Sequence, residues 1–82
     1  MSRKPTESEL QEENRRIRRL QIMVSLVMNV ISQGNLSVEE ASELIASTKQ
    51  AALNLFPDKE LAYDLIYKPR FQRLMQEKYR LN

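Results

Sequence analysis

The sequence predicts an all-α fold: a small three- or four-helix antiparallel bundle with a long N-terminal helix. The chain has 82 residues, which allows a single helical domain over residues 1–82. It contains one glycine and three prolines, too few turn-forming residues for an all-β domain. Hydrophobic residues make up 41% of the chain and charged residues 29%, enough for a core and a solvated surface.

The first helix is expected over about residues 7–33, after a flexible tail at residues 1–5. Thr6 or Ser8 can cap its start, and Glu9 follows Thr6 at capping-box spacing. Apolar residues then recur in alternating three- and four-residue steps, except where Glu13 stands in place of one of them. The members of this apolar stripe are Leu10, Ile17, Leu20, Val24, Val27 and Ile31.

A second apolar set gives the same helix apolar residues on most sides between Ile22 and Ile31. Its members are Met23, Leu26 and Val30. We therefore expect this part of the helix to be buried on more than one face, with the C-terminal helices covering the second set. The run is too short to span a membrane, and Ser25 and Asn29 interrupt it, so no membrane span is expected.

The next segment predicts a helical hairpin. Gly34 is expected to end the first helix in the left-handed conformation, with positive φ. Ser37 and Glu40 have capping-box spacing and start a second helix over about residues 38–55. The residues expected to face inward from this helix are Val38, Ala41, Leu44, Ile45, Thr48, Ala52 and Leu55.

The C-terminal part predicts two short helices, over about residues 58–67 and 69–80. Asp58 is expected to cap the first of them. Pro69 fits best as the first residue of the second, with a single helix kinked at Pro69 as the alternative. The residues expected to face inward are Leu61, Ala62, Leu65 and Ile66, followed by Phe71, Leu74 and Met75.

The side-chain inventory argues against catalysis. The chain has no cysteine and no histidine, which removes the usual zinc ligands, the commonest general base and the usual activator of a serine nucleophile. One glycine cannot build a phosphate-binding loop. We therefore expect a non-enzymatic protein with no cofactor, no metal and no small-molecule substrate. A cysteine-free chain of this size also fits a reducing compartment, so we expect a cytoplasmic location.

The lengths of the first two helices predict a surface for protein contacts. The first spans about 39 Å and the second about 27 Å, so the N-terminal part of the first helix meets no intramolecular surface. We therefore expect a small regulatory or adaptor protein that acts as a homodimer or binds a helical protein partner. The candidate interface residues are Leu10, Ile17, Leu20, Met23 and Val24. A monomer with a frayed helix start is the alternative, because Glu13 breaks the stripe.

Two basic clusters predict an alternative function, that of a nucleic-acid-associated accessory protein. The first cluster is Arg15, Arg16, Arg18 and Arg19, and the second is Lys68, Arg70, Arg73, Lys78 and Arg80. Basic groups close to Tyr67, Phe71 and Tyr79 suit phosphate contact combined with base stacking. The formal net charge is only +2, however, and four glutamates share the first helix with its arginines, so the pattern favours protein contact.

Overall fold

The computed structural model describes residues 4–80 and contains three helices, with no strand in that range. The helices are α1 (Glu7–Gln33), α2 (Val38–Leu55) and α3 (Glu60–Tyr79). The all-α prediction is confirmed, as is the long N-terminal helix, which has 27 residues. The expected tail at residues 1–5 falls mostly on residues 1–3, which lie outside the described residues.

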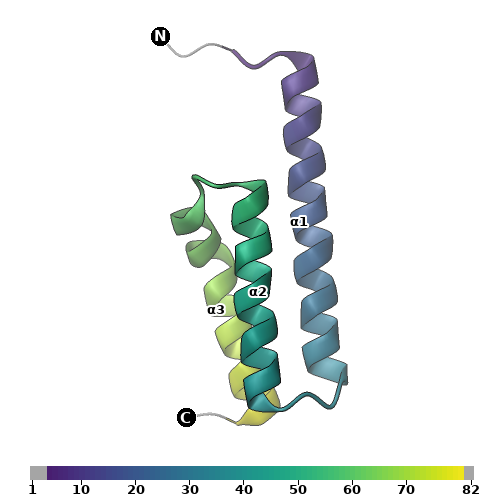
Figure 1. The fold of residues 1–82 in the computed structure, drawn as a ribbon, viewed down its shortest axis with the longest axis vertical. Coiled ribbons are helices and arrows are strands. Elements are labelled where there is room, and N and C mark those ends of the chain that lie inside the picture. Colours follow the sequence, from purple (N-terminus) through teal and green to yellow (C-terminus); the bar gives the residue numbers. More distant parts are fainter. Residues whose placement is uncertain (1–3, 81–82) are drawn as a thin grey trace.

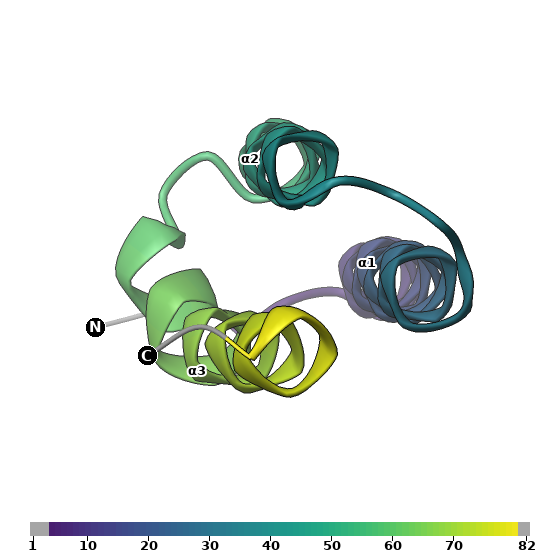
Figure 2. The same cartoon turned by 90° about the horizontal axis from the view of Figure 1, so that it is seen from below.

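The three helices contact one another pairwise, and viewed end-on they occupy the corners of a triangle (Figure 2). Consecutive helices run in opposite directions, so α1 and α3 point the same way (Figure 1). The molecule is elongated, with extents of 48 × 21 × 16 Å. Most of this length comes from α1, which extends past the other two helices at its N-terminal end (Figure 1).

The start of α1 is fixed by a side-chain cap. Thr6 is the N-cap residue, and its hydroxyl oxygen accepts a hydrogen bond of 3.1 Å from the backbone N–H of Glu9. The first part of α1, residues 7–19, is exposed at every position, and we call this segment the overhang. At about 1.5 Å per residue the overhang is roughly 20 Å long. A properly capped helix therefore projects from the bundle with no other helix covering its sides.

The prediction for Gly34 is wrong in its backbone conformation. The residue ends α1, but its φ is −90° and its ψ is 178°, which is extended backbone. Its N–H donates to the Val30 carbonyl at 2.8 Å, and a Cβ built on Gly34 would lie 2.5 Å from that same oxygen. Glycine is thus required here by the close approach of a carbonyl, and not by a left-handed turn.

The second helix follows its prediction closely. Ser37 and Glu40 form the expected capping box, with hydrogen bonds of 3.0 and 3.1 Å in the two directions. Ala41, Thr48 and Ala52 are its buried residues. The Thr48 hydroxyl donates to the Leu44 carbonyl at 2.7 Å, so this buried polar group is satisfied within the helix. The remaining expected inward residues of α2 are half-buried: Val38, Leu44, Ile45 and Leu55.

The two C-terminal helices expected from the sequence are one continuous helix. Pro69 lies inside α3, so its expected place at a helix start is wrong, and so is the four-helix version of the fold. Proline lacks the N–H that would bond to the Leu65 carbonyl. Both residues are exposed, so water can satisfy that carbonyl. The expected cap is also wrong, because the N-cap residue is Lys59 and no side chain caps this end.

Continuity of α3 changes the face that it presents to the core. Stepping back four residues at a time from Met75 and Phe71 gives Tyr67 and Tyr63, and all four are buried. The expected inward residues of the first half lie outside instead: Leu61, Ala62, Leu65 and Ile66 are exposed. The prediction failed because it assigned the two halves of the helix independently.

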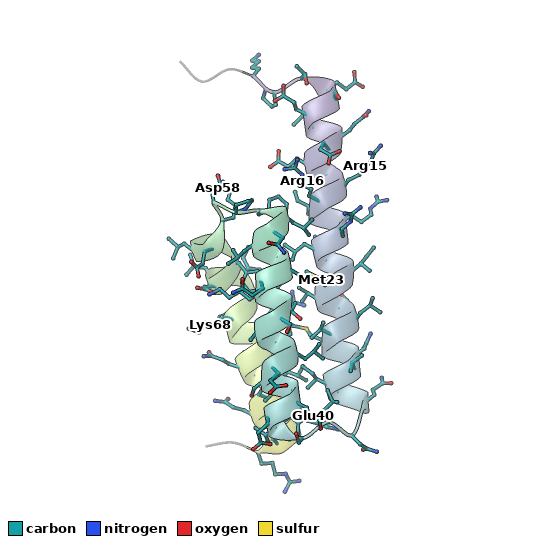
Figure 3. The ribbon with its side chains drawn as sticks, viewed as in Figure 1. Arg15, Arg16, Met23, Glu40, Asp58 and Lys68 are labelled. Atoms are coloured by element: carbon teal, nitrogen blue, oxygen red, sulfur yellow. The ribbon has the colours of Figure 1, made fainter. Side chains whose placement is uncertain are left out.

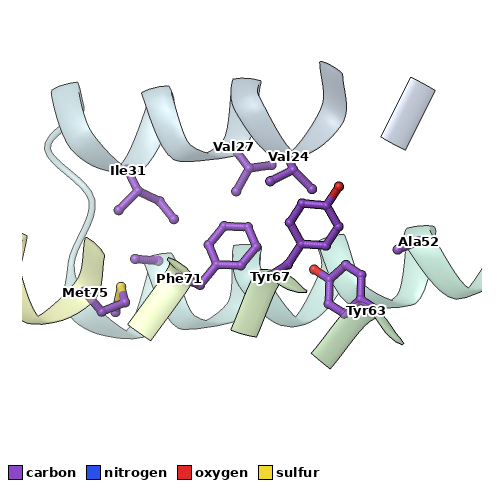
Figure 4. Packing of buried hydrophobic residues seen from close by; sticks show 9 residues of the cluster. Val24, Val27, Ile31, Ala52, Tyr63, Tyr67, Phe71 and Met75 are labelled. Carbon is purple, nitrogen blue, oxygen red and sulfur yellow. The ribbon is translucent and has the colours of Figure 1, made fainter. Parts of the chain in front are cut away.

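The core lies between the C-terminal half of α1 and both other helices (Figure 4). Its α1 members are Val24, Val27 and Ile31, and its α3 members are the four residues of the face just described. The rings of Tyr63 and Tyr67 lie 5.2 Å apart between centroids. Burial of α1 on a second face, however, is wrong. Leu26 and Val30 are exposed, because α2 and α3 both pack on one side of α1.

Two contacts tie the end of α3 to the last turn of α1 and to the loop that follows it. The Tyr79 hydroxyl donates to the Leu36 carbonyl at 2.8 Å. The Lys78 ammonium donates to the Ser32 carbonyl at 3.1 Å. They close the C-terminal end of the bundle, opposite the overhang. Among the described residues, no helix is both long enough and apolar enough to cross a membrane.

Candidate helix-docking site

The overhang continues the apolar stripe of α1 beyond the core. Val24 is 1% exposed, whereas Ile17 and Leu10 on the same stripe are 40% and 45% exposed. These two residues are one heptad apart, so they lie almost directly above each other on the helix surface. The overhang therefore presents two aliphatic side chains in line. They lie on the side of α1 that faces the core in the C-terminal half of the helix.

At the base of the overhang lies an open groove of about 500 Å³, which we call the apical groove. It is formed by α1, the C-terminal end of α2 and the first half of α3. Six apolar residues that line it are Ile17, Leu20, Leu53, Phe56, Ala62 and Ile66. Two of them, Ala62 and Ile66, come from the first half of α3, whose orientation the sequence did not reveal. Treating the C-terminal part of the chain as one continuous helix would have placed Ala62 and Ile66 at the apical groove.

The five candidate interface residues separate into three groups. Leu10 and Ile17 lie on the overhang and are accessible. Leu20 and Met23 are half-buried and pack against the core, although Leu20 also lines the apical groove. Val24 belongs to the core and cannot contact a partner, because α2 and α3 already cover it. The accessible site is thus Leu10 and Ile17 together with the groove below them.

The charged residues of the overhang fall into two consecutive blocks. The acidic block holds Glu7, Glu9, Glu12 and Glu13, and the basic block holds Arg15, Arg16, Arg18 and Arg19. Glu12 lies 3.8 Å from Arg15 and 3.6 Å from Arg16, and all three side chains are about half exposed or more. Arg15 and Arg16 point to different sides of the helix (Figure 3). Within residues 4–80, neither Arg18 nor Arg19 forms an ion pair.

A second, more polar recess lies between the overhang and the loop that joins α2 to α3. Its volume is about 590 Å³, and its lining includes Glu12 and Arg16 from the overhang with Asp58 and Lys59 from the loop. Asp58 sits at the tip of that loop (Figure 3). One flank of the overhang therefore faces charged groups, while the apolar stripe beside it faces the apical groove.

The two basic clusters do not form one surface. Arg15, Arg16, Arg18 and Arg19 lie on the overhang, whereas the second cluster lies along the second half of α3 and includes Arg80, its C-cap residue. Two members of the second cluster have intramolecular contacts. Arg70 lies over the Tyr67 ring, 5.7 Å from its centroid, and Lys78 bonds to Ser32. The side chain of Phe71 is in the core and is not available to stack on a base.

A separate polar cluster joins α2 to α3. The Lys49 ammonium lies 3.0 Å from a carboxylate oxygen of Glu60 and 3.1 Å from one of Asp64. The hydrogen bonds that the Lys49 ammonium donates, first to Glu60 and second to Asp64, raise the pKa of Lys49. Beside it, burial raises the pKa of the Tyr63 hydroxyl, which is buried with no hydrogen-bond partner. This arrangement holds the two helices together.

No group of three or more acidic side chains within residues 4–80 is placed to hold a metal ion. The overhang and the apical groove offer surfaces for apolar contact and for ion pairing. No protein-family model, no curated protein and no solved structure matches this chain.

Proposed function

We propose that the protein is a non-enzymatic helical interaction module that associates through the overhang and the apical groove. The observation that carries this proposal is the exposure of Leu10 and Ile17 on the same stripe that is buried at Val24. The simplest partner is a second copy of the chain, which makes the protein a homodimer. A regulatory or adaptor role in the cytoplasm follows from the small size, the lack of cysteine and the lack of a catalytic arrangement.

Energetics support a partner for this segment. A helix of about 12–15 residues is marginal in water unless an apolar face packs against something. Burying a leucine or isoleucine side chain completely stabilises by about 1.5–3 kcal/mol. Docking Leu10 and Ile17 would therefore order the overhang and supply much of the free energy of association. The polar flanks keep the unpaired surface soluble.

Sedimentation velocity of the wild type and of Leu10→Asp with Ile17→Asp tests the proposal. Both residues lie outside the core, so the double variant should keep the bundle and lose the association, because buried unpaired charge is costly. Ile22→Asp with Leu26→Asp on the outer face of α1 is the matched control and should still associate. A wild type that is monomeric at high micromolar concentration, with an unchanged melting temperature in the first variant, would refute the proposal.

Nucleic-acid binding through Arg15–Arg19 and Lys68–Arg80 is the alternative proposal. Electrophoretic mobility shifts with nonspecific DNA and RNA, measured at several salt concentrations, separate the two. Charge-driven binding weakens steeply as salt rises. Binding with that dependence, abolished by removing the basic residues of either cluster, would favour the alternative over the interaction module.

A further inference from the structure

We infer that two chains pair antiparallel through their overhangs, with a two-fold axis close to Asn14, so that Leu10 of each chain docks at the apical groove of the other. This inference rests on the proposed function and specifies its partner and geometry. It draws on three independent features: the order of the charge blocks, the length of the overhang and the position of the groove.

The charge blocks are arranged as mirror images about Asn14. In an antiparallel pair centred there, Glu13 of one chain lies level with Arg15 of the other, and Glu12 lies level with Arg16. A parallel pair would instead set glutamates beside glutamates and arginines beside arginines. Each exposed ion pair adds little to affinity, but like-charge contacts at every level would exclude the parallel arrangement.

The length of the overhang fits the same centre. When Asn14 of both chains lies on the axis, Glu7 of one chain is level with Gln21 of the other, and Ser8 is level with Leu20. Leu20 is the first residue of α1 that packs against the core. The two overhangs therefore overlap along nearly their whole length.

The apolar residues meet under this arrangement as well. Leu10 of one chain comes level with Arg18 of the other and so lies beside Ile17, at the upper rim of the apical groove. By symmetry the same contact forms at the other end of the pair. An isologous contact of this kind buries both exposed members of the stripe on each chain and covers the groove mouths.

Crosslinking of single-cysteine variants tests the geometry, because the chain has no cysteine of its own. Asn14→Cys should crosslink to itself with a short bis-maleimide. Gln21→Cys is the matched control, since it is also exposed and lies one heptad further along the same side of α1. In the antiparallel pair the two copies of position 21 are separated by about 21 Å along the axis, so this variant should not crosslink to itself.

A mixture of Glu7→Cys and Gln21→Cys supplies the positive counterpart. Neither should crosslink alone, and together they should give a covalent heterodimer, because the two positions lie level across the pair. Self-crosslinking of Gln21→Cys as efficient as that of Asn14→Cys would indicate a parallel pair. That result, or a failure of the mixture to crosslink, overturns this inference. If the unmodified wild type still sediments as a dimer in either case, the proposed function survives; if it sediments as a monomer, both fail.

Discussion

The overhang and the closed half of the molecule share one helix and one apolar stripe, but they differ in what covers the stripe. The closed half comprises residues 20–33 of α1 together with α2 and α3. In it the stripe is buried at Val24, Val27 and Ile31, whereas on the overhang it is exposed at Leu10 and Ile17. The periodicity is the same in both regions. An apolar stripe thus indicates that a helix needs a partner surface, while the lengths of its neighbours decide whether that surface lies in the same chain.

The polar contacts of the two regions differ in the same way. In the closed half they join residues distant in sequence, such as Lys49 with Asp64 and Tyr79 with Leu36. On the overhang, Glu12 forms ion pairs with arginines three and four positions further along the same helix. Contacts within one helix stabilise that helix but do not fix it against anything else.

The largest effect is expected from truncating the aromatic centre of the closed half. Phe71 is 2% exposed, so Phe71→Ala should destabilise the protein by about 3–5 kcal/mol. Leu65 on the same helix is 71% exposed, so Leu65→Ala should change stability by less than about 0.5 kcal/mol. Urea denaturation followed by circular dichroism gives both values. Equal losses for the two variants would contradict the observed orientation of α3.

The second prediction concerns the turn that joins α1 to α2. Gly34→Ala should cost about 1–3 kcal/mol, because the new methyl group would press on the Val30 carbonyl. The neighbouring exposed residue provides the control, and Asn35→Ala should have little effect. Thermal denaturation compares the two. If Gly34→Ala melts like the wild type, the close approach of that carbonyl does not constrain the turn.

Two tyrosines of α3 should respond in opposite directions to loss of the hydroxyl. Tyr79→Phe removes the hydrogen bond to Leu36 and should destabilise by about 0.5–1.5 kcal/mol. Tyr63→Phe removes a buried hydroxyl with no partner and should be neutral or stabilising, by up to about 1 kcal/mol. The midpoints of urea denaturation distinguish these outcomes. A clear loss of stability in Tyr63→Phe would mean that its hydroxyl is satisfied in solution.

The smallest effect is a pH dependence at the start of α2. The Ser37 backbone N–H lowers the pKa of Glu40 in the folded protein, so this glutamate stabilises the fold above its unfolded pKa. That contribution disappears as pH falls through the folded pKa, which lies below the ordinary pKa of a glutamate. The melting temperature of the wild type should therefore fall on acidification more than that of Glu40→Ala. Parallel curves for the two proteins would show that the capping box carries no such dependence.

The parts of the fold that the sequence predicted are those with local signals. Thr6, Ser37 and Glu40 fix helix starts through bonds to residues three positions away, and Gly34 marks an end whatever its φ. Pro69 misled because its effect depends on exposure: a missing N–H breaks a buried helix but is tolerated where water reaches the free carbonyl. The error at that residue then reversed the face assigned to the first half of α3.

The candidate site was also predicted only in part. The exposed pair Leu10 and Ile17 followed from helix lengths alone, since rise per residue is fixed. The apical groove could not be found in this way, because Phe56 and Ile66 reach it only through the packing of α3 against the other helices. Val24 shows the opposite error. Val24 lies on the same side of α1 as Ile17, one heptad further along. It is in the core because α2 and α3 cover that part of α1.

All three tyrosines of the chain lie on α3, and the chain has no tryptophan. The near-ultraviolet circular dichroism and intrinsic fluorescence of the protein therefore report on the docking of one helix in the closed half. Glu7 to Arg19 contribute no chromophore of this kind, so the overhang can unwind while these signals stay constant, whereas a partner docked at the apical groove would lie beside Tyr63 and Tyr67 and change them. A tryptophan introduced at Ile17 would give the projecting segment an optical signal of its own.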